Sequence, residues 1–197
     1  MKLLRITYII LLTLFLASCS TKEARTNSTV AVIERNILDT NFQLVNGVLL
    51  FKNEAFSGVV NTFYNSGELK SKSEYNEGKR NGMYQGWYEE GAKSFERFYT
   101  NGLKTGKHLG WYKDGQLKFM YHFNEHGEYD GEVSEWFPNG QLLKMFNYVD
   151  GKEDGRQRMW QLDGKIRANY VTKNGERFGL IGLKKCYSVD TKNEIIQ

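Results

Sequence analysis

The chain has 197 residues, of which 40% are hydrophobic and 14% aromatic, with 20 glycines and a single proline. Its 27 Lys and Arg residues face 23 Asp and Glu residues, and no basic block is interleaved with aromatic residues. This pattern lacks the electrostatic footprint of a nucleic-acid-binding protein, so we expect no nucleic-acid partner. The length suits one domain of ordinary size.

The N-terminus predicts export and lipid anchoring. Two basic residues precede an apolar run at residues 6–17, which is short for a bilayer span and placed where a secretory signal belongs. The run ends in Leu16-Ala17-Ser18-Cys19, which resembles the bacterial lipobox. The resemblance implies a lipoprotein signal peptide at 1–18, a diacylglycerol on Cys19 and anchoring to the cell membrane. Ser20 then implies the outer membrane, facing the periplasm or the surface; the alternative is an ordinary signal peptide with an incidental cysteine.

The remaining chain divides into three predicted parts. We expect a lipid anchor and flexible tether at 19–41, because its polar residues bury too little apolar surface to order the chain. A β-repeat domain is predicted at 42–190, beginning with a strand-like segment at 42–56 that looks like a degenerate first unit. Residues 191–197 are predicted to be a disordered tail. Once Cys19 is lipidated only Cys186 remains, so no internal disulfide is expected.

Glycines recur along the repeat domain with a pitch of 24 residues and one step of 25. They form three series, Gly67, Gly91, Gly115, Gly140 and Gly164; Gly78, Gly102, Gly127, Gly151 and Gly175; and Gly82, Gly106, Gly131, Gly155 and Gly179. A fixed pitch of this length indicates stacked supersecondary units, none of which buries its apolar face alone. Function is then expected on a repeated surface and not in one pocket.

Aromatic and aliphatic residues hold fixed positions around the first glycine series. The row four residues before it is Phe63, Trp87, Trp111, Trp136 and Trp160; the row three residues before it is Tyr64, Tyr88, Tyr112 and Phe137; and the row two residues after it includes Leu69, Leu117, Leu142 and Ile166. Such residues in short runs between glycine turns indicate strands. The fold class predicted is all-β, a repetitive antiparallel β-hairpin meander forming a single elongated twisted sheet.

The lone proline predicts the turn and therefore the register. Pro138 and Asn139 suit the central positions of a type I turn, followed by Gly140 in a left-handed bulge. Each residue of the Trp row then faces the Leu row, as Trp136 faces Leu142. Strict alternation places both rows on one apolar face, which we expect to be the repeat core. It adds Tyr75, Phe95, Tyr99, Phe119, Tyr121, Phe146 and Tyr148 to that face.

Two further expectations follow from the same alignment. The Tyr row, Tyr64, Tyr88, Tyr112 and Phe137, falls on the opposite and wetter face of the sheet, where it is a candidate binding surface. The third unit carries one inserted residue between Gly115 and Gly127, which predicts a bulge near Tyr121–Glu125.

The repeated pattern of aromatic pair, Asp/Glu-Gly, Leu-Lys and Asn/Asp-Gly resembles the MORN-repeat variant family. The segments Trp87–Gly91 and Trp111–Gly115 recur in phase, and the resemblance covers about Val48–Gly179, with departures at Glu54 and Gln161. Bacterial members of the family are often labelled YwqK-type toxin–antitoxin antitoxins, and many look like lipoproteins. The resemblance also implies membrane association and protein scaffolding.

Residues that carry chemistry are sparse, so no enzymatic activity, catalytic residue or cofactor is expected. His122 and His126 have the spacing of a helical metal pair, but no helix is predicted to present them, and we expect surface residues and no metal. The favoured interpretation is an envelope scaffold for a protein partner or for another copy of itself, because the Trp and Leu face of a single-layer sheet leaves apolar area that needs covering. One alternative is a module that binds envelope glycans through the Tyr row. The other is an antitoxin that neutralises a toxin partner.

Overall fold

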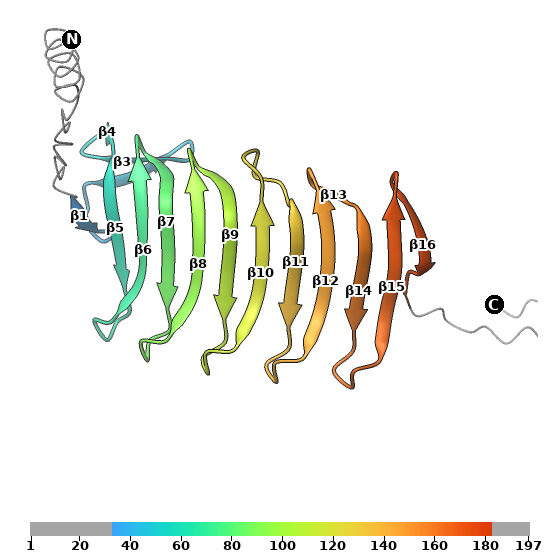
Figure 1. The fold of residues 1–197 in the computed structure, drawn as a ribbon. Helices are drawn as coiled ribbons and strands as arrows, with labels where there is room; N and C mark the ends of the chain where they lie inside the picture. Colours follow the sequence, from blue (N-terminus) through green and yellow to red (C-terminus); the bar gives the residue numbers. More distant parts are fainter. Residues whose placement is uncertain (1–32, 183–197) are drawn as a thin grey trace, which may run out of the picture. The chain divides into compact units, whose positions relative to one another are not determined.

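The computed structural model describes residues 33–182, which form sixteen strands and no helix (Figure 1). The strands are β1 Glu34–Asn36, β2 Phe42–Val45, β3 Val48–Phe51, β4 Glu54–Ala55, β5 Gly58–Phe63, β6 Leu69–Asn76, β7 Lys79–Trp87, β8 Lys93–Thr100, β9 Leu103–Trp111, β10 Leu117–Phe123, β11 Gly131–Trp136, β12 Leu142–Val149, β13 Lys152–Glu153, β14 Gly155–Trp160, β15 Ile166–Lys173 and β16 Glu176–Leu180.

Thirteen of the strands form one open sheet. Its order is β1-β5-β6-β7-β8-β9-β10-β11-β12-β14-β15-β16, with β13 pairing β12, and every pair except β1–β5 is antiparallel. Strands β2, β3 and β4 form a separate three-stranded sheet. The predicted all-β meander of hairpins is therefore confirmed, with a small second sheet in addition.

The turns that precede the Leu row have the predicted geometry. At Pro138, the Gly140 N–H donates to the Phe137 carbonyl at 2.9 Å, and the Phe137 N–H donates to Gln141 at 2.8 Å. Gly140 has a φ of +80°, which glycine adopts without steric cost. Four other hairpins repeat both hydrogen bonds, so one turn type sets the register of all five.

The predicted register is confirmed next to these turns, but a second bulge follows it. Trp87 pairs with Lys93, whereas Gly86 pairs with Phe95, so Ser94 is an extra residue in β8. The same shift occurs in the other four hairpins. An extra residue exchanges the two sides of a strand, because side chains alternate with a period of two.

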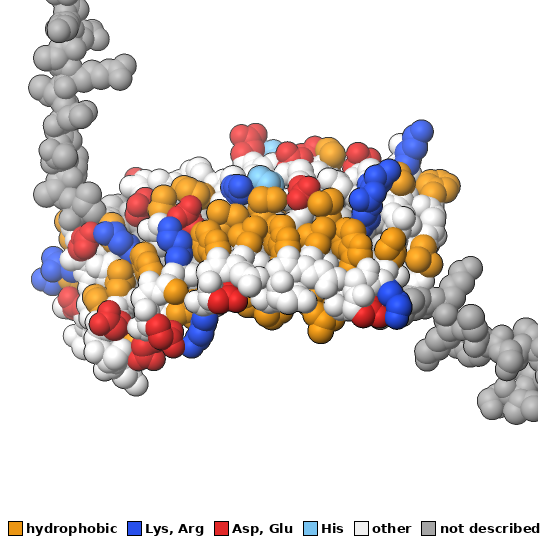
Figure 2. Space-filling view, turned by 60° about the horizontal axis from the view of Figure 1, so that its bottom comes forward, with side chains coloured by type: hydrophobic (Ala, Val, Ile, Leu, Met, Phe, Trp, Pro, Cys, Tyr) orange, Lys and Arg blue, Asp and Glu red, His pale blue; other side chains and the backbone are white. Residues whose placement is uncertain are grey.

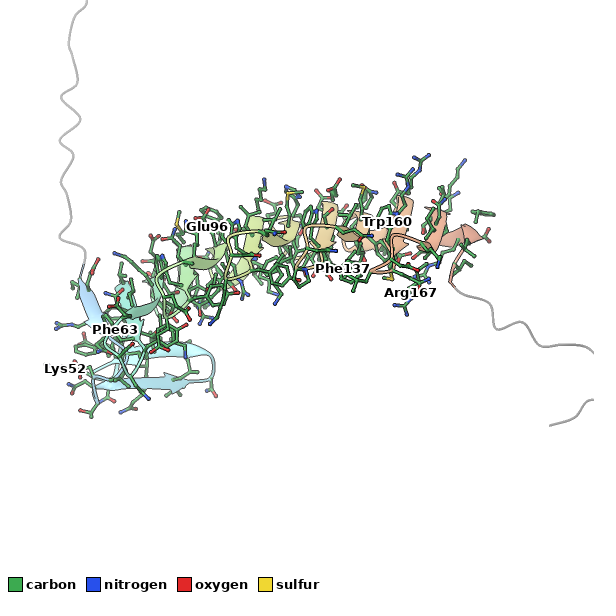
Figure 3. All side chains as sticks on the ribbon, turned by 90° about the horizontal axis from the view of Figure 1, so that it is seen from below. Lys52, Phe63, Glu96, Phe137, Trp160 and Arg167 are labelled. Carbon is green, nitrogen blue, oxygen red and sulfur yellow. The ribbon has the colours of Figure 1, made fainter. Side chains whose placement is uncertain are left out.

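This bulge corrects the predicted sorting of the faces. We call the side that bears Trp87, Trp111, Trp136 and Trp160 the Trp face, and the opposite side the Tyr face. The Trp face had been predicted to carry a second aromatic set, which the pairing places on the Tyr face: Tyr75, Phe95, Tyr99, Phe119, Tyr121, Phe146 and Tyr148. Trp160 and Phe137 lie on opposite sides of the ribbon, as predicted for the Trp and Tyr rows (Figure 3).

The inserted residue of the third unit lengthens a turn and leaves the strand regular. Pairing of β10 with β9 is unbroken from Phe119 to Phe123. After it, the Asn124 N–H donates to the Glu128 carbonyl at 2.9 Å, and Gly127 has a φ of +83°. Other units join these strands by two-residue turns such as Asn101-Gly102, with φ of +49° and +86°. The prediction of a bulge near Tyr121–Glu125 is therefore wrong by a few residues, because the extra residue lies in the turn that follows the strand.

The small sheet covers one end of the Tyr face. Leu49 and Phe56 pack with Val60 of β5 in a buried cluster, beside Phe42 and Tyr75. The segment 42–56, predicted as a degenerate first unit of the meander, is thus a separate layer (Figure 3).

A glycine allows this close contact between the two sheets. The Leu49 N–H donates to the Gly78 carbonyl at 2.8 Å. A Cβ on Gly78 would lie 2.3 Å from Val48 Cγ1, so only glycine fits there.

The predicted tether, 19–41, ends in paired structure. Strand β1 pairs in parallel with β5, with Arg35 opposite Val60. The N-terminal part of that range lies outside the described residues.

Candidate functional site

The rows predicted as the repeat core lie together on the Trp face, where most of their side chains are half-buried. Phe63 and Ile166, at the two ends, are 40% and 47% exposed. Figure 2 shows a band of hydrophobic side chains that runs across the hairpins beside the turns. The described apolar side chains that are fully buried belong to neither row: Leu49, Phe56, Val59, Val60, Val133, Ala168 and Tyr170.

The Tyr row joins neighbouring hairpins. The hydroxyls of Tyr64, Tyr88 and Tyr112 each donate to the backbone carbonyl of the next Trp, at Trp87, Trp111 and Trp136, and all three distances are 2.8 Å. Phe137 continues the row without a hydroxyl. Because each phenol hydroxyl donates its hydrogen bond to the adjacent repeat, the row forms a ladder of hydrogen bonds between hairpins.

Lysine side chains cover rings of the same row. Lys70 Nζ lies 5.3 Å from the Tyr64 ring centre, and Lys118 Nζ lies 5.5 Å from that of Tyr112. These distances suit cation–π attraction. The predicted binding surface is therefore half-buried and already occupied by contacts within the chain.

A second ladder ties the opposite ends of the hairpins. The Gly102 N–H donates to the Arg80 carbonyl at 2.8 Å, and the Gly151 N–H donates to the Tyr129 carbonyl at 2.9 Å. The Gly78 N–H donates in the same way to Phe56. The two ladders join neighbouring hairpins at both ends of their strands. They therefore fix the spacing between the hairpins of this single-layer sheet.

Aromatic side chains form a continuous row along the Tyr face, and this row includes Tyr99 and Tyr148 of the relocated set. Ring centres are 6.3 Å apart for Tyr84–Tyr99, 5.6 Å for Tyr99–His108, 4.6 Å for His108–Phe123, 4.8 Å for Phe123–Tyr129 and 5.2 Å for Tyr129–Tyr148. We call the half-buried part of this face between Phe95 and Tyr148 the aromatic surface. Apart from the buried His108, its rings remain partly accessible to solvent.

His108 anchors the middle of this row. It is only 2% exposed, and its Nε2 lies 2.8 Å from the Phe98 carbonyl. Burial is the main cause that lowers the pKa of His108, helped by the nearby charges of Arg97 and Lys104. The ring is therefore neutral near pH 7 and packs as an aromatic side chain.

Cations lie over the rings of the Tyr face. Arg97 is 4.5 Å from the Phe95 ring centre, and Lys104 is 5.4 Å from that of Phe123. Both line a hollow of about 260 Å³ together with His108 and Tyr121. Between residues 33 and 182 no carboxylate lies within ion-pair distance of either cation.

Towards the C-terminal end the corresponding cations are neutralised. Arg177 binds Glu153 at 2.9 Å, and Lys144 binds Glu135 at 2.7 Å. Tyr170 donates to the same Glu153, and burial together with that negative charge raises the pKa of Tyr170 to about 12. Among the cations that lie over these rings, Arg97 and Lys104 of β8 and β9 thus lack the carboxylate partner that Arg177 and Lys144 have.

Sequence reasoning missed the aromatic surface, although the sequence contains a signal for it. The Phe95 ring lies over Gly86 and the Phe119 ring over Gly110, where an added Cβ would come within 2.1 Å of the ring. The next two hairpins have Glu135 and Met159 at the glycine position, and their facing residues are not aromatic. A register that places each of these glycines opposite an aromatic residue of the neighbouring strand would have predicted the bulge.

Metal and membrane-spanning features are absent from the described part of the chain. No group of three His, Cys, Asp or Glu residues there could hold a metal ion. His122 binds the Glu132 carbonyl through Nδ1 at 2.9 Å, and His126 lies exposed in a turn. Residues 33–182 contain no helix long and apolar enough to cross a membrane. Cys19 and Cys186 lie outside the described residues.

Three of the hairpins match the model of a known repeat family. A family model described as MORN repeat variant matches residues 57–77, 104–125 and 129–150. These segments correspond to the hairpins β5–β6, β9–β10 and β11–β12. No curated protein matches the sequence. The chain is thus similar to the MORN repeat variant family over three hairpins, and the hairpins β7–β8 and β14–β15, outside the matched segments, share the same turn and bulge.

Proposed function

We propose that the protein is a non-enzymatic scaffold, anchored in the cell envelope by lipid, that binds a protein partner through the aromatic surface. The observation that carries this proposal is the continuous row of half-buried rings across β8–β12. Within the described residues, the second layer formed by β2–β4 packs at the β5–β6 end. Large apolar surfaces left open on a folded protein commonly mark sites of protein binding.

The chemistry of this surface suits a polypeptide partner. Aromatic residues and arginine are enriched where protein interfaces concentrate their binding energy. Phe95, Tyr99 and Tyr121 are held by neighbouring rings, so binding costs little side-chain entropy. Arg97 and Lys104 have no acidic partner in the described chain and favour a partner that supplies carboxylates.

The N-terminal sequence supports the envelope location of this scaffold. A lipid on Cys19 would leave fourteen residues before β1 at Glu34. Fully extended, that length spans at most about 50 Å. The repeats would then work close to the membrane. Incorporation of labelled palmitate into the wild-type chain, with loss in Cys19→Ser, is the expected result; equal labelling of both chains would contradict the anchor.

The decisive test of the scaffold reverses charge on one face at a time. The intact protein is crosslinked mildly in cells and its co-purifying proteins are quantified for wild type and Arg97→Glu/Lys104→Glu. The control is Lys107→Glu/Arg158→Glu, which makes the same charge change on the Trp face. We expect one protein, a second copy included, to be recovered with wild type and control and lost with the Tyr-face variant. Equal recovery with both variants would contradict the proposal.

Glycan binding through the Tyr row is less well supported. Its hydroxyls already bind the neighbouring repeat, and lysines cover two of its rings. Retention on purified envelope glycans that falls in Tyr88→Ala/Tyr112→Ala would nevertheless favour that alternative. The antitoxin alternative has no corresponding feature among the contacts described.

A further inference from the structure

A cavity lies where the small sheet meets the Tyr face. It has a volume of about 450 Å³ and is lined by Ile37, Leu44, Leu49, Tyr75, Lys79 and Arg80, with glycines from three turns between them. One wall is thus apolar and the other carries the positive charge of Arg80. The size falls within the range of small-molecule sites, about 300–1,000 Å³.

Arg80 is the unusual residue of this cleft. Its guanidinium carbon lies 4.8 Å from the Tyr84 ring centre, 5.7 Å from Tyr99 and 5.8 Å from Tyr75. These rings fix the side chain and attract its charge. No described carboxylate lies within ion-pair distance of Arg80, and its Nε is buried without a hydrogen-bond partner.

The guanidinium of Arg80 has no counterion among the described residues, and an anion in the cleft would supply one. Guanidinium groups bind carboxylates through two parallel hydrogen bonds, and the three rings already orient this one. The apolar wall opposite would receive the remainder of such a ligand.

We propose that this cleft binds a small amphipathic anion, with a carboxylate on Arg80 and an apolar body against Ile37, Leu44 and Leu49. The site occurs once, because the β2–β3 hairpin that forms its apolar wall is not one of the five repeated hairpins. The backbone hydrogen bond from the Leu49 N–H to the Gly78 carbonyl holds the cleft open in advance. The proposal does not rest on protein binding by the aromatic surface, although Arg80 contacts Tyr99 at the margin of that surface.

The test compares two probes of the same shape on the full chain. Isothermal titration calorimetry with 2-naphthoate is expected to show one site, at least tenfold tighter than that of neutral 2-naphthamide. Arg80→Gln is expected to lose this preference. The control Arg97→Gln removes an arginine that also lies over two rings of the same face but outside the cleft, and should keep it. Equal affinity for the two probes, or an unchanged preference in Arg80→Gln, would overturn the proposal.

A second variant tests the same site in case Arg80→Gln does not fold. Leu44 is 72% exposed, so Leu44→Glu should fold normally and place a negative charge at the cleft. We expect it to weaken 2-naphthoate binding at least tenfold, with Leu44→Gln as the matched neutral control. Methyl NMR shifts in the full chain should be confined to Ile37, Leu44 and Leu49. Shifts located elsewhere, or equal affinity in the two Leu44 variants, would overturn the site.

Discussion

The two ends of the Tyr face differ in whether anything covers them. Beneath β2–β4, Leu49, Phe56 and Val60 are 3–5% exposed and form a compact cluster. Further along, over β8–β12, Phe95 and Phe119 stay half-buried although their hairpins have the same register. The repeat therefore buries single side chains of this face, such as Val133 and Tyr170, but leaves Phe95 and Phe119 half-buried where no second layer covers them.

Removing a ring from the covered end should have the largest effect on stability. Phe56→Ala is expected to lower the free energy of unfolding by about 3–5 kcal/mol, because it empties the buried cluster. Phe95→Ala on the open surface should cost about half as much, since its ring already contacts water. Chemical denaturation of the full chain measures both. Equal losses would show that the open face is as well packed as the covered end.

Adding a methyl group at the contact between the sheets should have the next largest effect. Gly78→Ala and Gly115→Ala both strain a residue of positive φ, at +77° and +84°. Only Gly78 meets another side chain, so we expect its variant to be less stable than Gly115→Ala by about 1–3 kcal/mol. Thermal melts of the two proteins provide the comparison. Identical melting temperatures would mean that the small sheet moves aside without cost.

The Tyr ladder predicts opposite effects at two positions of one row. Tyr88→Phe should destabilise the sheet by about 1 kcal/mol, because the Trp111 carbonyl loses its donor. Phe137→Tyr should stabilise it by a similar or smaller amount by offering a hydroxyl to the equivalent carbonyl of Trp160. Denaturant midpoints of the two variants check the pair. Destabilisation by Phe137→Tyr would show that the ladder ends before that hairpin.

Acidification should weaken the open region slightly through His108. Burial lowers the pKa of His108, so the unfolded chain takes up a proton first as the pH falls through the ordinary histidine value of about 6.5. The contribution of the neutral ring is therefore complete above that pH and is lost below it, by at most about 1.4 kcal/mol per pH unit. Stability measured between pH 6.5 and 5 should fall less in His108→Gln than in the exposed control His126→Gln. The same slope in both would remove His108 as the cause.

The sequence predicted the strands, the turn at Pro138 and the pairs beside it, because glycine spacing and proline chemistry are local signals. It did not predict where Phe95 and Phe119 lie, since Ser94 and Lys118 look like ordinary strand residues and their bulges depend on pairing across the hairpin. The separate sheet at 42–56 was missed for a similar reason. Its strands have the same pattern as a repeat, and only contacts with Gly78 and Val60 set them apart.

We infer that the aromatic surface of the Tyr face binds a protein. It is tested most directly by placing a photo-crosslinking amino acid at position 97 of the full chain in cells, with position 158 on the Trp face as the control. The account predicts a discrete crosslinked protein from position 97 and none from position 158. A crosslink from position 158 alone, or no crosslinked protein from position 97, would contradict it.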